Sequence, residues 1–177
     1  MFLRAKSDAI VVFLFLFLLV NQASADWFNA EEKIMGTLVT VELWHDDSGV
    51  AKTAIAAVMA DMRRVEDLMS PYKESGELYQ LNHLAAKHAM AVSPELFSLI
   101  EKSVDYSQLS DGAFDISFAS VGRWYNYRQG VSPEPEQLRD NLEAIDYRLI
   151  EMNRAEQRVQ FHHPELNIDL GGIAKGH

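Results

Sequence analysis

The order of apolar and polar residues predicts a strand and a long helix in the first half of the chain. Residues 37–44 alternate, with Val39, Val41 and Leu43 on one face, which is typical of a half-buried β-strand. Over residues 50–69 the apolar positions recur at steps of three and four, as on one face of a helix. This stripe consists of Ile55, Val58, Met62, Val65 and Met69. The serine and proline at positions 70 and 71 predict the helix end.

A second long helix is predicted to begin near residue 93. Ser93 followed by Pro94 fits an N-cap with proline in the first helical position. The buried face of this helix would consist of Leu96, Phe97, Ile100 and Val104. Asp111 and Gly112 are turn residues that predict its end, and residues 135–144 predict a shorter helix.

The last third of the chain predicts strands. Residues 149–153 and 159–162 are rich in apolar residues on either side of a polar turn, which indicates a β-hairpin. Residues 167–170 predict one more strand. Strands and helices in this irregular order indicate an α+β fold, a mixed sheet with packed helices, rather than a regular βαβ repeat.

The first 25 residues have the layout of a secretory signal peptide. Arg4 and Lys6 precede an apolar zone at residues 9–20, and small residues follow up to Ala25. The apolar zone is shorter than the roughly 20 residues that a membrane-spanning helix needs. We therefore expect cleavage after Ala25 and export to the periplasm, which leaves residues 26–177 as one domain. An uncleaved membrane anchor is the alternative.

Charge and residue types exclude several classes of function. The formal net charge is −10, and the densest basic cluster is Arg63 with Arg64, so we expect no nucleic acid partner. Without cysteine, the chain has no disulfide, no redox thiol and no thiol-anchored lipid. His83 and His88 are five residues apart, which misses the helical spacing of a zinc-binding pair.

Residues 167–176 are the most informative stretch for chemistry. Gly171 and Gly172 follow the predicted last strand and precede residues able to start a helix. Glycine lets a backbone approach a ligand closely, and a helix start offers unpaired N–H groups to a phosphate. Lys175 could add a positive charge, and Asp169 could bind a hydroxyl group or a cation. The spacing is not that of a P-loop, and a purely structural glycine turn is the alternative.

A second candidate site lies at residues 111–117. There Phe114 and Asp115 follow a turn, where a ring and a carboxylate could hold a planar ligand. The alternative is a helix end followed by a strand with Phe114 and Ile116 in the core. Met35 and Tyr72 lie at the edges of loops and suit contact with a large heteroaromatic ligand, although they could equally fill the core.

Taken together, these places resemble the FAD:protein FMN transferases of the ApbE family in order and spacing. The resemblance covers residues 32–177 and is carried by MGT at 35–37, MSPY at 69–72 with EL at 77–78 and LN at 81–82 after it, GAFDIS at 112–117 and DLGGIAKG at 169–176. It implies an ApbE-like domain, related to the T-fold and truncated at its C-terminus. By the matching motifs, FAD would be contacted by Met35, Tyr72, Ala113, Phe114, Asp115, Asp169 and Lys175. The carbonyl group of Gly172 would bind Mg²⁺.

The activity that the resemblance implies is a magnesium-dependent transfer of FMN. FAD would be cleaved, FMN would pass to a threonine hydroxyl of a target protein, and AMP would be released. The acceptors would be exported or membrane-bound redox subunits, so the enzyme could associate with the inner membrane through its substrates. A noncatalytic exported flavin-binding module is the main alternative, and a small-molecule binding domain is another.

Three departures from the family pattern bear on these expectations. Residues 118–124 lack the Pro-Leu pair that the family usually shows before its tryptophan, and Lys175 stands where some members carry Glu. Family members also continue beyond the position of His177 into a part that supplies Asp and Thr ligands to the metal. Because Mg²⁺ requires six oxygen ligands, we expect this chain alone to bind flavin poorly and to transfer nothing.

Overall fold

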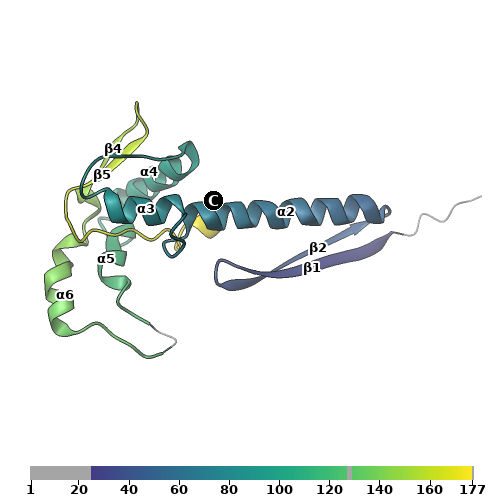
Figure 1. Ribbon diagram of the computed structural model, residues 1–177, viewed down its shortest axis with the longest axis horizontal. Coiled ribbons are helices and arrows are strands. Elements are labelled where there is room, and N and C mark those ends of the chain that lie inside the picture. The colour runs from purple at the N-terminus through teal and green to yellow at the C-terminus, as the bar shows by residue number, and fades with distance from the viewer. Residues whose placement is uncertain (1–24, 127–128, 177) are drawn as a thin grey trace, which may run out of the picture. The chain divides into compact units, whose positions relative to one another are not determined.

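The computed structural model describes residues 25–126 and 129–176 (Figure 1). These residues form helices and small antiparallel sheets, so the predicted α+β class is confirmed. The chain divides into two compact units, one ending at Ala60 and one starting at Asp61. The predicted signal peptide lies outside the described residues except for Ala25. Within the described ranges, the structure has no helix with the length and apolar character needed to cross a membrane.

The N-terminal unit is built on a β-hairpin. Strand β1 (Asp26–Ile34) pairs antiparallel with β2 (Thr37–His45) along its whole length. Met35 and Gly36 form the turn with φ angles of 53° and 70°, and positive φ at both central residues is what a type I′ hairpin turn requires. Strand β2 confirms the predicted strand. Strand β1 was not predicted, because Glu32 interrupts the apolar residues on its inner face.

Helix α2 (Ser48–Met69) confirms the predicted long helix and its end. Its N-terminus is capped by Asp47, whose Oδ1 accepts hydrogen bonds from the N–H groups of Gly49 at 2.7 Å and Val50 at 3.0 Å. The hydrogen bonds from Val50 and Gly49 hold the pKa of Asp47 below its ordinary value of 3.8. The acidic residue before the helix therefore stabilises its first turn in the ionised form.

The apolar stripe predicted on α2 is only partly correct. Ile55 and Met59 pack on the hairpin, whereas Met69 belongs to the core of the C-terminal unit. Val58 and Met62 of the predicted stripe are 42% and 37% exposed. The helix contributes to two separate cores, and the exposure of Val58 and Met62 shows that the predicted stripe is not buried along its whole length.

Two helices form the centre of the C-terminal unit. Helix α3 (Glu77–Leu84) was not predicted, whereas α4 (Pro94–Leu109) begins where the sequence predicted it. Ser93 caps α4, since its Oγ accepts a hydrogen bond from the Leu96 N–H at 3.3 Å. The same hydroxyl donates to the Glu77 carboxylate at 2.8 Å, so the start of α3 is joined to the start of α4.

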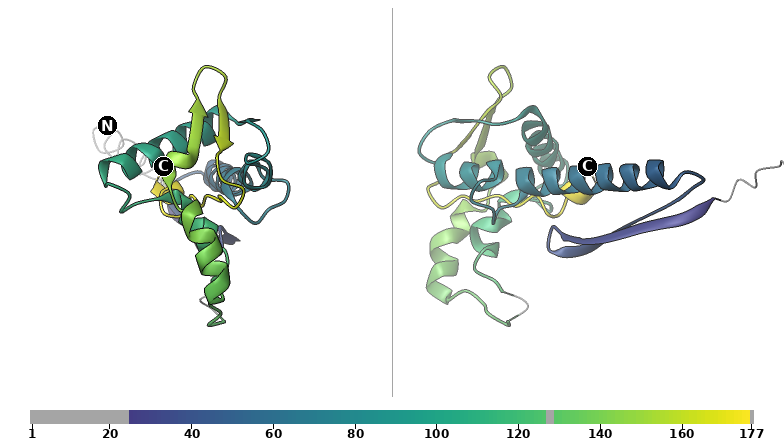
Figure 2. Two further views of the ribbon diagram at one scale, coloured as in Figure 1. Left: turned by 90° about the vertical axis from the view of Figure 1, so that its left-hand side faces the viewer. Right: turned by 45° about the vertical axis from the view of Figure 1, so that its right-hand side comes forward.

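The remaining elements lie around these helices. Strands β3 (Met90–Ala91), β5 (Arg158–Phe161) and β4 (Ile150–Asn153) form an antiparallel sheet in that order, which confirms the predicted hairpin. Helix α6 (Pro135–Asn141) continues into a short 3₁₀ helix and confirms the predicted shorter helix. Within this unit, the β4–β5 hairpin and α6 lie at opposite ends (Figure 2), and the short helix α5 (Ala119–Gly122) lies beside α6 (Figure 1).

The core of the C-terminal unit joins α3 and α4 to the stretch that follows β5. Its fully buried large side chains are Leu78, Leu81, Leu96, Leu99, Ile100, Ile116, Val159, Phe161, Leu166, Ile168 and Leu170. Each buried aliphatic side chain of this size contributes about 1.5–3 kcal/mol relative to its exposed state. The last three members lead directly into the glycine stretch, so the core anchors the candidate site.

Candidate functional site

The segment before the two glycines is extended but is not a strand. It was predicted as a strand at residues 167–170, and this prediction is wrong. Its backbone is paired with Asn82 and Ile116 instead of with a neighbouring strand: Asn82 bonds both polar groups of Ile168, and the Asp169 N–H donates to the Ile116 carbonyl oxygen at 3.0 Å. The pattern of alternating buried residues is the same in both cases, which explains the wrong prediction.

The glycine turn itself is exposed at the surface of the unit. The N–H groups of Ile173 and Ala174 both donate to the Leu170 carbonyl oxygen, at 3.0 and 2.7 Å, which closes the turn. Gly171 and Gly172 are exposed, and the helix that follows is a single 3₁₀ turn, Ala174–Gly176. The exposed backbone at Gly172 is the part of the turn that a ligand can approach, since the N–H groups of Gly171, Ile173 and Ala174 already donate within the protein.

Asp169 is bound closely to this turn. Its Oδ1 accepts a hydrogen bond from the Gly171 N–H at 2.6 Å. A β-carbon at Gly171 would lie 2.9 Å from the same oxygen, a distance that real β-carbons essentially never show. Glycine at 171 therefore allows the carboxylate to fold over the turn.

The loop that carries Phe114 and Asp115 is held by a capping carboxylate. Asp115 Oδ1 accepts hydrogen bonds from the Ser117 N–H at 2.8 Å and the Ser117 hydroxyl at 2.6 Å. Asp115 Oδ2 accepts from the Tyr147 N–H at 2.9 Å. This cap starts a 3₁₀ helix, Ile116–Phe118, so the alternative of a strand after the turn is wrong, whereas the core position of Ile116 is confirmed.

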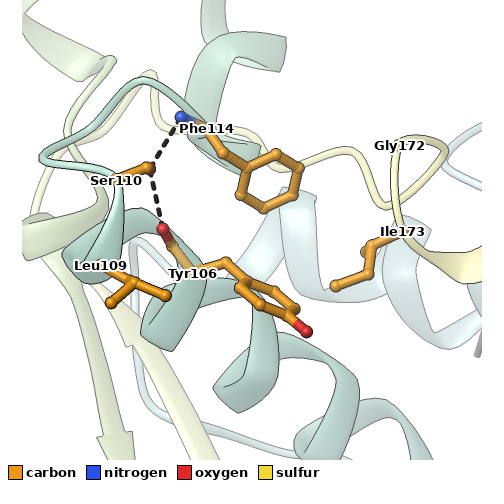
Figure 3. A pocket seen from close by; sticks show the side chains of 6 residues that line it. All are labelled: Tyr106, Leu109, Ser110, Phe114, Gly172 and Ile173. Carbon is orange, nitrogen blue, oxygen red and sulfur yellow. Dashed lines mark hydrogen bonds between the residues drawn. The ribbon is translucent and has the colours of Figure 1, made fainter.

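Phe114 and the glycine turn meet at a cavity of about 350 Å³ (Figure 3). The residues that line this cavity are Tyr106, Leu109, Ser110, Phe114, Gly172 and Ile173. The Tyr106 and Phe114 rings stand edge to face, with centroids 6.5 Å apart and an interplanar angle of 85°. Ser110 Oγ accepts from the Phe114 N–H at 3.0 Å and donates to the Tyr106 carbonyl oxygen at 2.7 Å, which ties the two aromatic residues together.

Six of the predicted site residues lie on the two segments that meet at the cavity, and the other two lie on other parts of the chain. Phe114 and Gly172 line the cavity, and Ala113, Asp115, Asp169 and Lys175 are their neighbours along the two segments. Tyr72 is 82% exposed in the loop after α2. Met35 belongs to the other unit, where it is half-buried against the hairpin core.

One aromatic and one aliphatic residue that line the cavity were not predicted from the sequence. Tyr106 and Leu109 are 47% and 83% exposed at the end of α4. Both are apolar residues that fall outside the buried stripe of that helix, three positions apart and directly before the turn. Two apolar residues on the solvent-facing side of an amphipathic helix are the sequence signal that could have identified them.

The comparison with protein families decides the classification of the chain. The model of the ApbE family matches residues 35–177. The chain belongs to the ApbE family. The match starts at Met35 and takes in all four motifs that suggested the resemblance.

Individual relatives agree with membership of the ApbE family. The chain is 24% identical over 157 residues to an FAD:protein FMN transferase of Treponema pallidum, covering 84% of this chain and 43% of the relative. The ApbE protein of Thermotoga maritima superposes with a TM-score of 0.74 at 25% identity, covering 85% of this chain and 49% of that one. The flavin transferase ApbE of Vibrio cholerae has the same fold, with a TM-score of 0.72 at 23% identity, covering 86% and 50%. The chain thus spans about half the length of these relatives.

The described residues do not by themselves fit a magnesium site. Within residues 25–126 and 129–176, no group of three or more His, Asp or Glu side chains could hold a metal ion. The Gly172 carbonyl oxygen can supply one ligand, whereas Mg²⁺ takes six oxygens in an octahedron. Any cation at this turn would depend mainly on water, on a diphosphate ligand and on groups outside the described residues.

Proposed function

We propose that the chain is part of an FAD:protein FMN transferase, which moves FMN from FAD to a threonine hydroxyl of an acceptor protein and releases AMP. The observation that carries this proposal is the meeting of Phe114 with the exposed glycine turn at one cavity. An aromatic wall beside open backbone suits a ligand that joins a planar ring to a diphosphate. The relatives at about a quarter identity bear the name of this activity.

In the proposed reaction the flavin ring lies in the cavity and the diphosphate lies along the glycine turn. The threonine oxygen attacks the phosphorus of the FMN half and forms a new P–O bond. The P–O bond to the AMP half breaks, AMP leaves with the bonding electrons, and the threonine proton passes to solvent. Mg²⁺ would neutralise charge on the phosphate oxygens when bound. The chain's own residues orient FAD, with Tyr106 and Phe114 as the aromatic wall beside the ring.

The setting of this activity is also part of the proposal. Residues 1–25 would direct the protein to the periplasm, where its acceptors would be exported or membrane-bound redox subunits. The net charge of −10 argues against a polyanionic partner such as nucleic acid.

The transfer chemistry should require more than residues 26–177. With Mg²⁺, FAD and an acceptor protein that carries the target threonine, a version of the protein as long as its relatives should release AMP, and chelation of the metal should stop the release. Purified residues 26–177 should release none, because Gly172 offers the cation a single backbone oxygen. The measurement is chromatographic detection of AMP. Release by residues 26–177 alone, or none from the longer protein, would contradict the proposal, and FAD binding without release would point to a flavin-binding module.

Tyr106 should contribute to FAD binding through its ring. In the full-length protein, Tyr106→Ala should weaken FAD binding by about five- to tenfold, because one aromatic wall of the cavity is removed. Stability should change little, since Tyr106 is 47% exposed. The control is Tyr106→Phe, which keeps the ring and should bind FAD within about twofold of the wild type. Flavin fluorescence quenching gives both affinities. Equal FAD affinity in the two variants would show that the flavin ring does not contact Tyr106.

A further inference from the structure

Asn82 on α3 holds the segment that leads into the glycine turn. Its Nδ2 group donates to the Ile168 carbonyl oxygen at 3.0 Å, and its Oδ1 accepts from the Ile168 N–H at 2.9 Å. One side-chain amide thus pairs with both backbone polar groups of a residue 86 positions further along the chain. Because a backbone N–H only donates and a carbonyl only accepts, the pairing also determines which way the Asn82 amide points.

This pair of hydrogen bonds replaces the strand that the segment lacks. The Ile168 side chain is fully buried, and a buried backbone group without a partner is costly. The residues on either side are held separately: the Asn167 N–H donates to Ser120 Oγ at 3.0 Å, and the Asp169 N–H donates to the Ile116 carbonyl oxygen at 3.0 Å. Ser120 Oγ also lies 3.4 Å from the Asn167 carbonyl oxygen, but its one hydroxyl proton is shared with the Ala144 carbonyl oxygen at 3.1 Å. The Asn82 amide differs because it has a separate donor and a separate acceptor for the two groups of Ile168.

We propose that Asn82 is a positioning residue for FAD. By clamping Ile168, it sets the place of Asp169 and of the exposed turn at Gly171 relative to the wall formed by Phe114. This inference rests on the proposed function and adds a residue that touches no ligand itself. The buried side chains of the segment keep it attached to the core, so losing the clamp leaves both backbone groups of Ile168 unpaired and loosens the backbone before the turn without removing the core beneath it.

The test compares Asn82→Leu with a control variant in the full-length protein. Leucine has a similar size and can form neither hydrogen bond. The control is Val159→Ala in β5, which weakens the same core at a fully buried position and contributes nothing to the lining of the cavity. Two quantities are measured at a temperature where both variants are folded: amide hydrogen exchange at Ile168, Asp169 and Gly171, and the Kd for FAD by fluorescence quenching.

In Asn82→Leu, we expect amide exchange at Ile168 to be about tenfold faster and the Kd for FAD to be about tenfold higher. In Val159→Ala, the Kd should stay within about twofold of the wild type even though its melting temperature falls. Unchanged exchange at Ile168, or an equal loss of FAD affinity in both variants, would overturn the inference. If the wild type itself binds no FAD, the proposed function fails, whereas the exchange result still decides whether Asn82 holds the turn.

Discussion

Replacing Asp115 with alanine should lower the free energy of unfolding by about 2–4 kcal/mol. Its carboxylate accepts three hydrogen bonds, two from Ser117 and one from the Tyr147 N–H. Ser117 is fully buried, so removing the acceptor leaves a buried N–H and hydroxyl without their partner. The loss should be measured by urea unfolding of the wild type and the variant, with the same slope in both.

The matched control for this prediction is Asp115→Asn. Asparagine keeps one acceptor oxygen of the same geometry but turns the other into a donor, which cannot serve both Ser117 and the Tyr147 N–H. Its loss of stability should be about half that of the alanine variant. Because Phe114 is the preceding residue, FAD affinity should fall in the same order. An alanine variant as stable as the wild type would show that the three hydrogen bonds are exchanged for water at no cost.

Gly76→Ala should destabilise the protein by about 1–3 kcal/mol. The backbone of Gly76 has φ −78° and ψ 148°, which alanine adopts without strain. The cost is therefore steric: the added β-carbon would lie 2.5 Å from the Asp67 carbonyl oxygen and 3.1 Å from that of Lys73. Both contacts are to backbone atoms, which cannot rotate away, so the end of α2 would have to move from the start of α3.

A second glycine provides the control for Gly76. A β-carbon at Gly172 would meet Phe114 Cε2 at 3.6 Å, an ordinary van der Waals contact. Gly172→Ala should therefore change stability by less than about 0.5 kcal/mol, and thermal unfolding of the two variants should differ accordingly. Equal melting temperatures for both alanine variants would mean that the loop at Gly76 can move to accommodate the added β-carbon at little cost in stability.

The predictions made from the sequence agree with the structure where an element depends on interactions between residues that are close together in the chain. Helix α4 was predicted because its cap at Ser93 and its apolar face are local features. Helix α3 was missed because it has eight residues, its N-cap position is Gly76, and no side chain caps it. Strand β1 was missed because a charged residue, Glu32, lies on its half-buried face.

In the candidate site, too, some residues were predicted from the sequence and others were found only in the structure. The sequence motifs singled out Phe114 and Gly172, and both line the cavity in the structure. Tyr106 was missed, because its position outside the buried stripe of α4 is a weaker signal than a glycine pair or a family motif. Lys175 and Tyr72 stay predictions as FAD contacts, and their exposed side chains leave them open to a ligand.

The sequence by itself determined the elements with a strong local pattern, the acidic and cysteine-free character of the chain, and the motifs of the ApbE family. Only the tertiary structure decided what the segment before Gly171 pairs with and where the cavity lies. The reason is that periodicity reports which side of an element is buried, whereas it carries no information about the partner. Asn82 and Ile168 are far apart in the chain, and their hydrogen bonds exist because the core brings α3 beside that segment.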